Sequence, residues 1–157
     1  MVGIQTPDLQ GKWPMTVRRN SLGDYTVLAL SLGFAAVFLY AGIDKIRDPL
    51  QFADSVAAFA ILPRVLITPL ALSLPPFEIA CGLLLLWPPT RRVGALAVAL
   101  ISLVFFTALL SALLRGLTLD CGCFGVGAPS RFRMWLELGL NVILFGGSVL
   151  IYQRSKI

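Results

Sequence analysis

The run VGALAVALISLVFFTALLSALL, residues 93–114, contains no charged side chain and has the length of a membrane-spanning helix. About 20 apolar residues are needed to cross ~30 Å of hydrocarbon at ~1.5 Å of rise per residue. Three similar runs occupy residues 25–43, 65–87 and about 132–152. None of the four alternates with the period of two that is typical of a barrel strand. The sequence therefore predicts an all-α membrane protein, a bundle of four transmembrane helices.

The composition supports this prediction. Charged residues make up 13% of the chain, whereas soluble domains contain about 25%. The net charge of +5 comes mainly from basic residues between or just outside the apolar runs, as expected for contacts with lipid headgroups. Basic segments interleaved with aromatic residues are missing, which argues against nucleic-acid binding. Histidine is absent, so the commonest metal ligand is missing and we expect no metal site.

The chain divides into three parts. Residues 1–24 form a polar tail, residues 25–152 the four-helix membrane domain, and residues 153–157 a short basic C-terminus. Basic residues before an apolar run are also typical of a secretory signal. The long tail and the three further runs favour an uncleaved first span. The basic tail and the tight turn at 88–92, PPTRR, predict that both termini are cytoplasmic.

The charged segment DKIRDP, residues 44–49, is expected to connect the first two spans. Asp48 followed by Pro49 is typical of a helix start, because the carboxylate caps backbone N–H groups and proline lacks one. Apolar residues then recur at helical spacing up to Pro63, which we expect to end the element. This pattern predicts a short amphipathic helix at the membrane interface.

The loop before the last span contains Cys121-Gly122-Cys123-Phe124-Gly125. A disulfide between residues two apart is strained, because good geometry requires Cα atoms ~5.5 Å apart. Strained bridges are the labile, catalytic kind. Arg131 and Arg133 follow the loop and would favour a thiolate. A redox-active pair on the outer face, where disulfides persist, is the favoured interpretation. A structural bridge, or a metal site whose further ligands are missing, remains the alternative.

Glu78 is a carboxyl group within a predicted span, where ionisable side chains usually face the bundle interior. It either handles protons or contacts a quinone, or it is a neutral, hydrogen-bonded packing residue; the sequence leaves both open. Cys81 lies about one turn further along the same predicted span, and we expect it to be a small, buried hydrophobic residue.

Two further groups of polar residues have alternative roles. The charges at 44–48 are expected to form a local ion network that holds the short helix. Alternatively, Lys45 reaches the cysteine loop and stabilises a thiolate. Arg133 and Glu137, one turn apart, are expected to pair along the last helix. Contact of Glu137 or Asn141 with a quinone ring is the less favoured alternative.

Several blocks of sequence together resemble one family. They are AGIDKIRDP (41–49), LP (62–63), LPPFE (74–78), GLLLL (82–86) and DCGCFG (120–125). They resemble the MauE family of methylamine utilisation proteins, part of the wider DoxX-like group of small four-helix membrane proteins. The resemblance covers residues 25–152. It implies a redox-associated protein of the bacterial inner membrane. The matching blocks include Lys45, Glu78, Cys121 and Cys123, which are the residues to which the family's role is carried over. MauE is linked to making or delivering a disulfide-rich subunit of methylamine dehydrogenase, but methylamine is not implied for this chain.

Two functional hypotheses follow. In the first, Cys121 and Cys123 exchange disulfides with an extracytoplasmic thiol or disulfide protein, either thioredoxin-like or a client enzyme. A quinone in the lipid bilayer is then a candidate electron carrier, by analogy with other small helical-bundle thiol oxidoreductases. In the second, the protein is a non-catalytic scaffold or assembly factor for an extracytoplasmic redox enzyme, and its disulfide is structural. Small-solute transport is less favoured, because four helices leave little room for a pore.

Overall fold

The computed structural model of the chain describes residues 21–119 and 130–155, which form five helices and no strand. Their bounds are α1 Ser21–Arg47, α2 Pro49–Ala58, α3 Arg64–Leu86, α4 Arg91–Leu114 and α5 Arg131–Arg154. Helices α1, α3, α4 and α5 are each long and apolar enough to cross a membrane. The predicted class, an all-α protein with four transmembrane helices and a short helix after the first, is confirmed.

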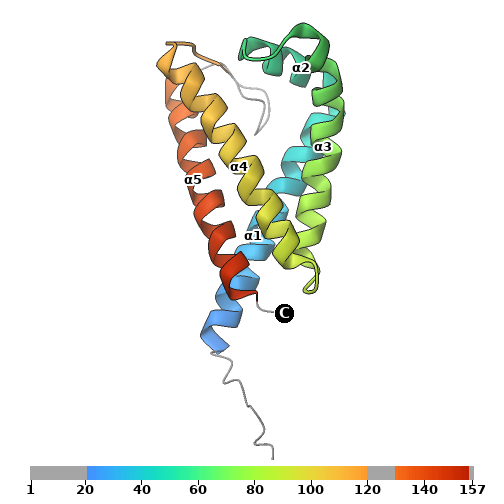
Figure 1. The fold of residues 1–157 in the computed structure, drawn as a ribbon, viewed down its shortest axis with the longest axis vertical. Coiled ribbons are helices and arrows are strands. Elements are labelled where there is room, and N and C mark those ends of the chain that lie inside the picture. Colours follow the sequence, from blue (N-terminus) through green and yellow to red (C-terminus); the bar gives the residue numbers. More distant parts are fainter. Residues whose placement is uncertain (1–20, 120–129, 156–157) are drawn as a thin grey trace, which may run out of the picture.

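The long helices form two close pairs, α1 with α3 and α4 with α5, whereas α1 and α5 touch less extensively. Figure 1 shows that α2 lies at one end of the bundle, together with the end of α1 and the start of α3. The end of α4 and the start of α5 lie at the same end, which we call the α2 end. Toward this end, α4 and α5 diverge from α3. The turn between α3 and α4 lies at the opposite end.

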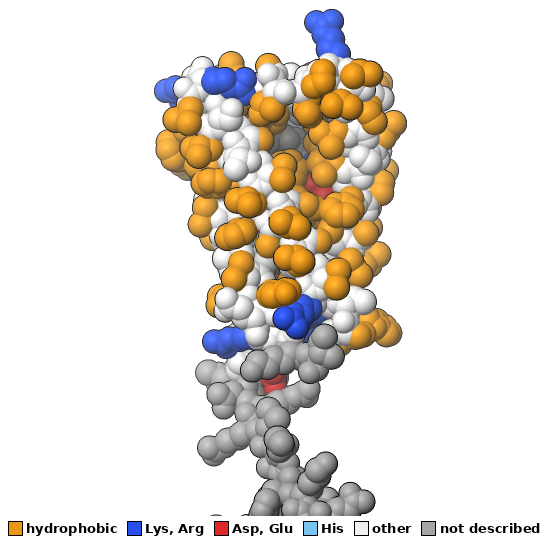
Figure 2. Space-filling view, viewed as in Figure 1, with side chains coloured by type: hydrophobic (Ala, Val, Ile, Leu, Met, Phe, Trp, Pro, Cys, Tyr) orange, Lys and Arg blue, Asp and Glu red, His pale blue; other side chains and the backbone are white. Residues whose placement is uncertain are grey.

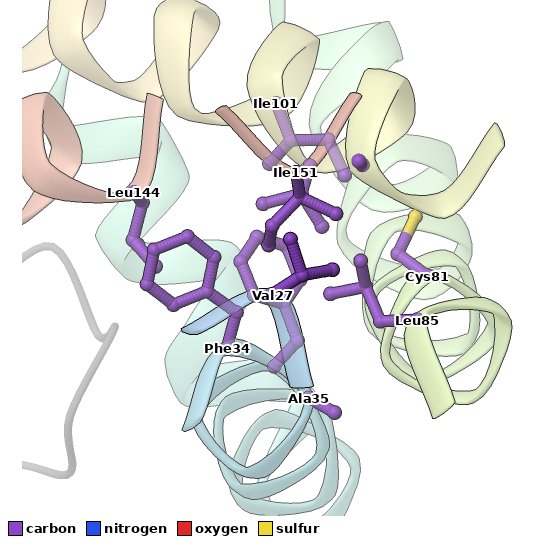
Figure 3. Packing of buried hydrophobic residues seen from close by; sticks show 11 residues of the cluster. Val27, Phe34, Ala35, Cys81, Leu85, Ile101, Leu144 and Ile151 are labelled. Atoms are coloured by element: carbon purple, nitrogen blue, oxygen red, sulfur yellow. The ribbon is translucent and has the colours of Figure 1, made fainter. Parts of the chain in front are cut away.

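The surface suits a lipid environment. Figure 2 shows one face, on which hydrophobic side chains cover the body of the bundle and basic side chains lie at its two ends. Leu100 on α4 and Ile143 on α5 are among the exposed apolar side chains. Inside, a cluster that includes Phe34, Cys81 and Ile151 joins α1, α3 and α5 (Figure 3).

One predicted boundary was wrong. Asp44, Lys45 and Arg47 do not lie in a connecting segment but in the last turn of α1, which continues to Arg47. The helix can continue here because the Lys45 side chain is buried in the bundle, and only Asp48 separates α1 from α2.

The predicted start of α2 is confirmed. Pro49 occupies its first position, and Oδ1 of Asp48 accepts a hydrogen bond of 3.1 Å from the backbone N–H of Gln51. Phe52 faces inward and is buried, whereas Leu50 is exposed. We had expected Pro63 to end this helix, but it does not. Helix α2 ends at Ala58, and Pro63 precedes the first residue of α3.

Ala60 follows α2 with a φ of 50°, a left-handed conformation that costs an L-residue about 1–2 kcal/mol. We expect Ala60→Gly to raise the free energy of unfolding by about 0.5–1 kcal/mol, because glycine adopts this φ without strain. Ala57→Gly, within the helix and also exposed, should lower it by a similar amount. Thermal unfolding in detergent measures both; a loss of stability in both variants would contradict the strain at Ala60.

Helices α1 and α3 approach closely at Gly42. A Cβ atom added there would lie 2.7 Å from Cγ1 of Ile79 and 2.9 Å from the carbonyl oxygen of Pro75. Small residues allow this kind of backbone contact between membrane helices. The close approach brings the middle of α3 against the last turns of α1.

Gly42→Ala is therefore expected to destabilise the bundle by about 1–3 kcal/mol, because the backbones of α1 and α3 must separate. Gly33→Ala is the matched control on the same helix, since nothing lies within 4 Å of its added Cβ. It should leave stability unchanged or raise it by up to about 1 kcal/mol. Unfolding in mixed micelles compares the two, and equal effects would contradict the close contact at Gly42.

Candidate functional site

The most distinctive feature of the bundle interior is an ion pair between Lys45 of α1 and Glu78 of α3. The Lys45 ammonium donates hydrogen bonds of 2.9 and 3.1 Å to the two carboxylate oxygens. The Lys45 and Glu78 side chains are 1% and 3% exposed. Charges buried in a membrane protein usually pair with one another and mark functional positions. The close approach of α1 and α3 at Gly42 positions this pair.

Two aromatic rings flank the same ammonium. Its nitrogen lies 5.4 Å from the ring centre of Phe52 on α2 and 6.0 Å from that of Phe105 on α4. Aromatic faces attract a cation electrostatically, and this effect grows when the cation is desolvated. Lys45 thus contacts α2, α3 and α4 at once.

A small cavity adjoins the ion pair. It lies between α1 and α5, which contact each other less than the helices of the two close pairs do. Its volume is about 40 Å³ and its polar lining residues are Lys45, Glu78, Glu137 and Asn141. At about 10–15 Å³ per water, it has room for about three water molecules. Asn141 donates a 2.9 Å hydrogen bond to the backbone oxygen of Glu137, and both residues are buried. Figure 2 shows an acidic side chain within a hollow of the hydrophobic surface, toward the α2 end.

Cys121 and Cys123 lie outside the described residues, but the chain on both sides of their loop is described. The backbone N–H of Leu119 donates a 3.3 Å hydrogen bond to the sulfur of Met134. Leu119 also packs against a hydrophobic cluster that includes Phe59, Leu109 and Met134. After the loop, Ser130 precedes the first turn of α5. Both flanks are therefore attached to the α2 end of the bundle.

A further bond joins α2 to the end of α4. Nη2 of Arg115 donates to the backbone oxygen of Phe59. Together with the cluster around Phe59, it links the α1–α3 pair to the α4–α5 pair at this end.

The structure agrees with some of the predictions for site residues and not with others. Among the described residues, the ion pair of Lys45 is with Glu78, so the expected network with Asp44 and Asp48 was wrong for Lys45. The reason is that Lys45 points into the bundle, where a carboxylate of α3 lies within reach. Arg131 and Arg133 occupy the first turn of α5 at the α2 end. A contact of either arginine with the cysteines falls outside the described residues.

Sequence reasoning missed the pairing of Lys45 with Glu78. One signal was present, because a lysine and a glutamate in otherwise apolar helices are each costly alone and usually pair. Cys81 lies in the hydrophobic core and is 1% exposed, which agrees with its interpretation as a small hydrophobe.

Comparison with known proteins gives consistent matches. The family model described as "Methylamine utilisation protein MauE" matches residues 23–153. The chain is 36% identical over 117 residues to methylamine utilization protein MauE of Paracoccus denitrificans, covering 74% of this chain and 62% of that protein. It is 37% identical over 106 residues to the protein of that name from Methylophilus methylotrophus, covering 66% of this chain and 56% of the relative. The matches thus span less than two thirds of these relatives' length. No solved structure matches the chain.

Proposed function

Because this chain belongs to the MauE family of methylamine utilisation proteins, we propose that it is an accessory membrane protein that exchanges disulfides through Cys121 and Cys123. One observation carries the proposal. The chain is attached to the α2 end on both sides of the cysteine loop, through Leu119 and the start of α5. A pair of thiols presented from a fixed frame suits repeated encounters with a partner protein.

The proposed chemistry is thiol–disulfide exchange. A thiolate of the partner attacks the Cys121–Cys123 bridge and forms a mixed disulfide, releasing the other cysteine as a thiolate. A second thiolate of the partner then attacks the mixed disulfide. The partner gains a disulfide, and the two cysteines are left reduced. Arg131 and Arg133, in the first turn of α5, supply positive charge that would stabilise the released thiolate.

The proposed location is the bacterial inner membrane, with both termini in the cytoplasm and the α2 end facing outward. Its support is the short basic turn that begins α4. Arg92 of this turn stacks on Tyr152 near the end of α5, at 4.5 Å from the ring centre, so the turn and the C-terminus share one end. Basic residues next to short connections favour the cytoplasmic side. The partner is then an extracytoplasmic protein with thiols or a disulfide, either thioredoxin-like or a client enzyme. We propose methylamine utilisation as one candidate pathway, and the relatives' names support it.

Trapping of mixed disulfides tests the exchange. Cells express Cys121→Ser, Cys123→Ser or the double variant, and proteins linked to each are identified after thiols are blocked. One single variant should hold a partner covalently, because its remaining cysteine can attack the partner's disulfide but no second cysteine is present to close the bridge and release the partner. The double variant should hold none. If both single variants capture nothing and retain full function in cells, the exchange proposal is wrong.

The second candidate is a scaffold whose disulfide only stabilises the loop. The anchoring of Leu119 on Met134 favours it, since a structural bridge also needs a fixed base. In that case the double serine variant should lose stability but keep its function in cells.

A further inference from the structure

Three arginines lie at the end of the bundle opposite α2. Arg91 and Arg92 begin α4, and Arg154 is the last residue of α5. Figure 1 shows the turn that leads into α4 and the end of α5 at this end of the bundle, which we call the turn end. The stacking of Arg92 on Tyr152, at 4.5 Å from the ring centre, joins α4 to α5 here.

The other two arginines contact the remaining membrane-spanning helices. Nε of Arg91 donates a 3.2 Å hydrogen bond to the backbone oxygen of Leu85, near the end of α3. Nη1 of Arg154 lies against the first turn of α1, 3.3 Å from the position of a Cβ atom added to Gly23. The three side chains thus contact the ends of α1, α3 and α5 from one small region of the surface.

The described residues do not neutralise this positive charge. Of the described acidic side chains, Asp24 in the first turn of α1 lies at this end, and it forms no ion pair with any of the three arginines. Arg92 is half-buried, and its Nε is enclosed without a hydrogen-bond acceptor among the described residues. Polar groups in such positions normally have acceptors. An anion from outside the protein, bound by the outer Nη groups of Arg92, would supply one.

The turn end lies at the level of the lipid headgroups. Trp87, directly after α3, is 65% exposed, and Tyr25, near the start of α1, is 71% exposed. Such aromatic side chains are typical of the membrane–water interface. Leu96 and Leu100 follow Arg92 at intervals of four residues along α4, and both are exposed. A ligand whose phosphate contacts Arg92 can therefore lay an acyl chain along this apolar stripe.

We propose that Arg92, flanked by Arg91 and Arg154, binds the phosphate group of an anionic phospholipid at the turn end. A guanidinium offers paired N–H donors that match phosphate oxygens, and stacking on Tyr152 holds its plane in place. The N-terminus of α4 adds the positive end of its helix dipole. A lipid with net negative charge is attracted by all three arginines, whereas they repel the ammonium group of a zwitterionic lipid.

The proposed orientation of the protein agrees with this ligand. It places the turn end in the cytoplasmic leaflet, whose anionic lipids attract arginines next to membrane-spanning helices. The site lies at the opposite end from the cysteine loop, so it is independent of disulfide exchange.

Native mass spectrometry of purified protein in detergent measures the binding. Wild-type protein should bind phosphatidylglycerol about tenfold more tightly than phosphatidylcholine, which carries no net charge. Arg92→Gln keeps a polar side chain but removes the charge. It should weaken the binding of phosphatidylglycerol about tenfold, the usual effect of losing one hydrogen bond to a charged group.

Arg64→Gln is the matched control. Arg64 is the first residue of α3 and is exposed at the α2 end, so its replacement removes the same charge from another helix start. Its affinity for phosphatidylglycerol should equal that of the wild type. Tyr152→Leu keeps all three arginines but removes the ring below Arg92. It should weaken the binding about threefold, the size of a cation–π contact at an exposed site.

Three results would overturn the proposal. Equal weakening in Arg92→Gln and Arg64→Gln would indicate a general attraction of basic residues to anionic lipid. Equal affinity of the wild type for the two lipids would contradict the site without relying on any variant. Displacement of phosphatidylglycerol by millimolar inorganic phosphate would identify a site for free anions instead. Weakening in Arg92→Gln alone, with binding that resists inorganic phosphate, supports the lipid site.

Discussion

Replacing Lys45 with methionine is expected to lower the free energy of unfolding by about 3–5 kcal/mol, the usual cost of leaving one partner of a buried ion pair alone. The Glu78 side chain is 3% exposed and accepts two hydrogen bonds from the ammonium of Lys45. Methionine has a similar length but no charge, so the carboxyl group loses its cation without gaining water. Unfolding in mixed micelles, monitored by circular dichroism, measures the loss.

Arg47→Met is the matched control for this prediction. Arg47 lies in the same turn of α1 but is exposed, so its replacement should change stability by less than about 0.5 kcal/mol. The double variant Lys45→Met/Glu78→Leu should recover much of the loss, because two apolar side chains often replace a buried pair without penalty. Additive losses in the double variant would show that the two side chains are not coupled.

Replacing either Cys121 or Cys123 with serine is expected to abolish disulfide transfer. One thiol must accept the partner's sulfur and the other must leave, so neither single variant can complete a cycle. The measurement is the oxidation of a peptide that contains two cysteines by protein in nanodiscs whose Cys121/Cys123 pair has first been oxidised. Wild-type protein should form one peptide disulfide per chain, and both single variants should form none.

Cys81→Ala is the control for this second prediction. Cys81 is 1% exposed and packs with Leu85 in the core of the bundle (Figure 3). The variant should keep the full rate of peptide oxidation and lose some stability from the missing sulfur. A large fall in rate would indicate that Cys81 takes part in electron transfer, contrary to its interpretation as a packing residue.

The fold could be predicted because its signals are local. Each span is a long apolar run that only a helix satisfies in lipid, and the start of α2 follows from Asp48 and Pro49 alone. The end of α1 could not be placed, because it depends on a distant residue. Helix α1 continues through Lys45 to Arg47, and the Lys45 side chain meets a carboxylate on α3.

The site was predicted less completely for the same reason. Lys45 and Glu78 are 33 residues apart, and their pairing depends on the rotation and depth of two helices, which apolar periodicity does not define. The cavity beside the pair depends on how α5 faces α1, since Glu137 and Asn141 of α5 line it together with Lys45. The cysteine pair could be recognised from the sequence because only Gly122 separates its two members.

The reduction potential of the Cys121/Cys123 couple is the most direct test of an exchangeable disulfide held at the α2 end. It can be measured in nanodiscs by equilibration with glutathione buffers, followed by thiol alkylation and mass analysis of Cys81→Ala protein. A catalytic pair should lie between about −270 and −120 mV, the range of known thiol–disulfide oxidoreductases. A value below about −300 mV is typical of an inert structural bridge and would contradict the proposed exchange.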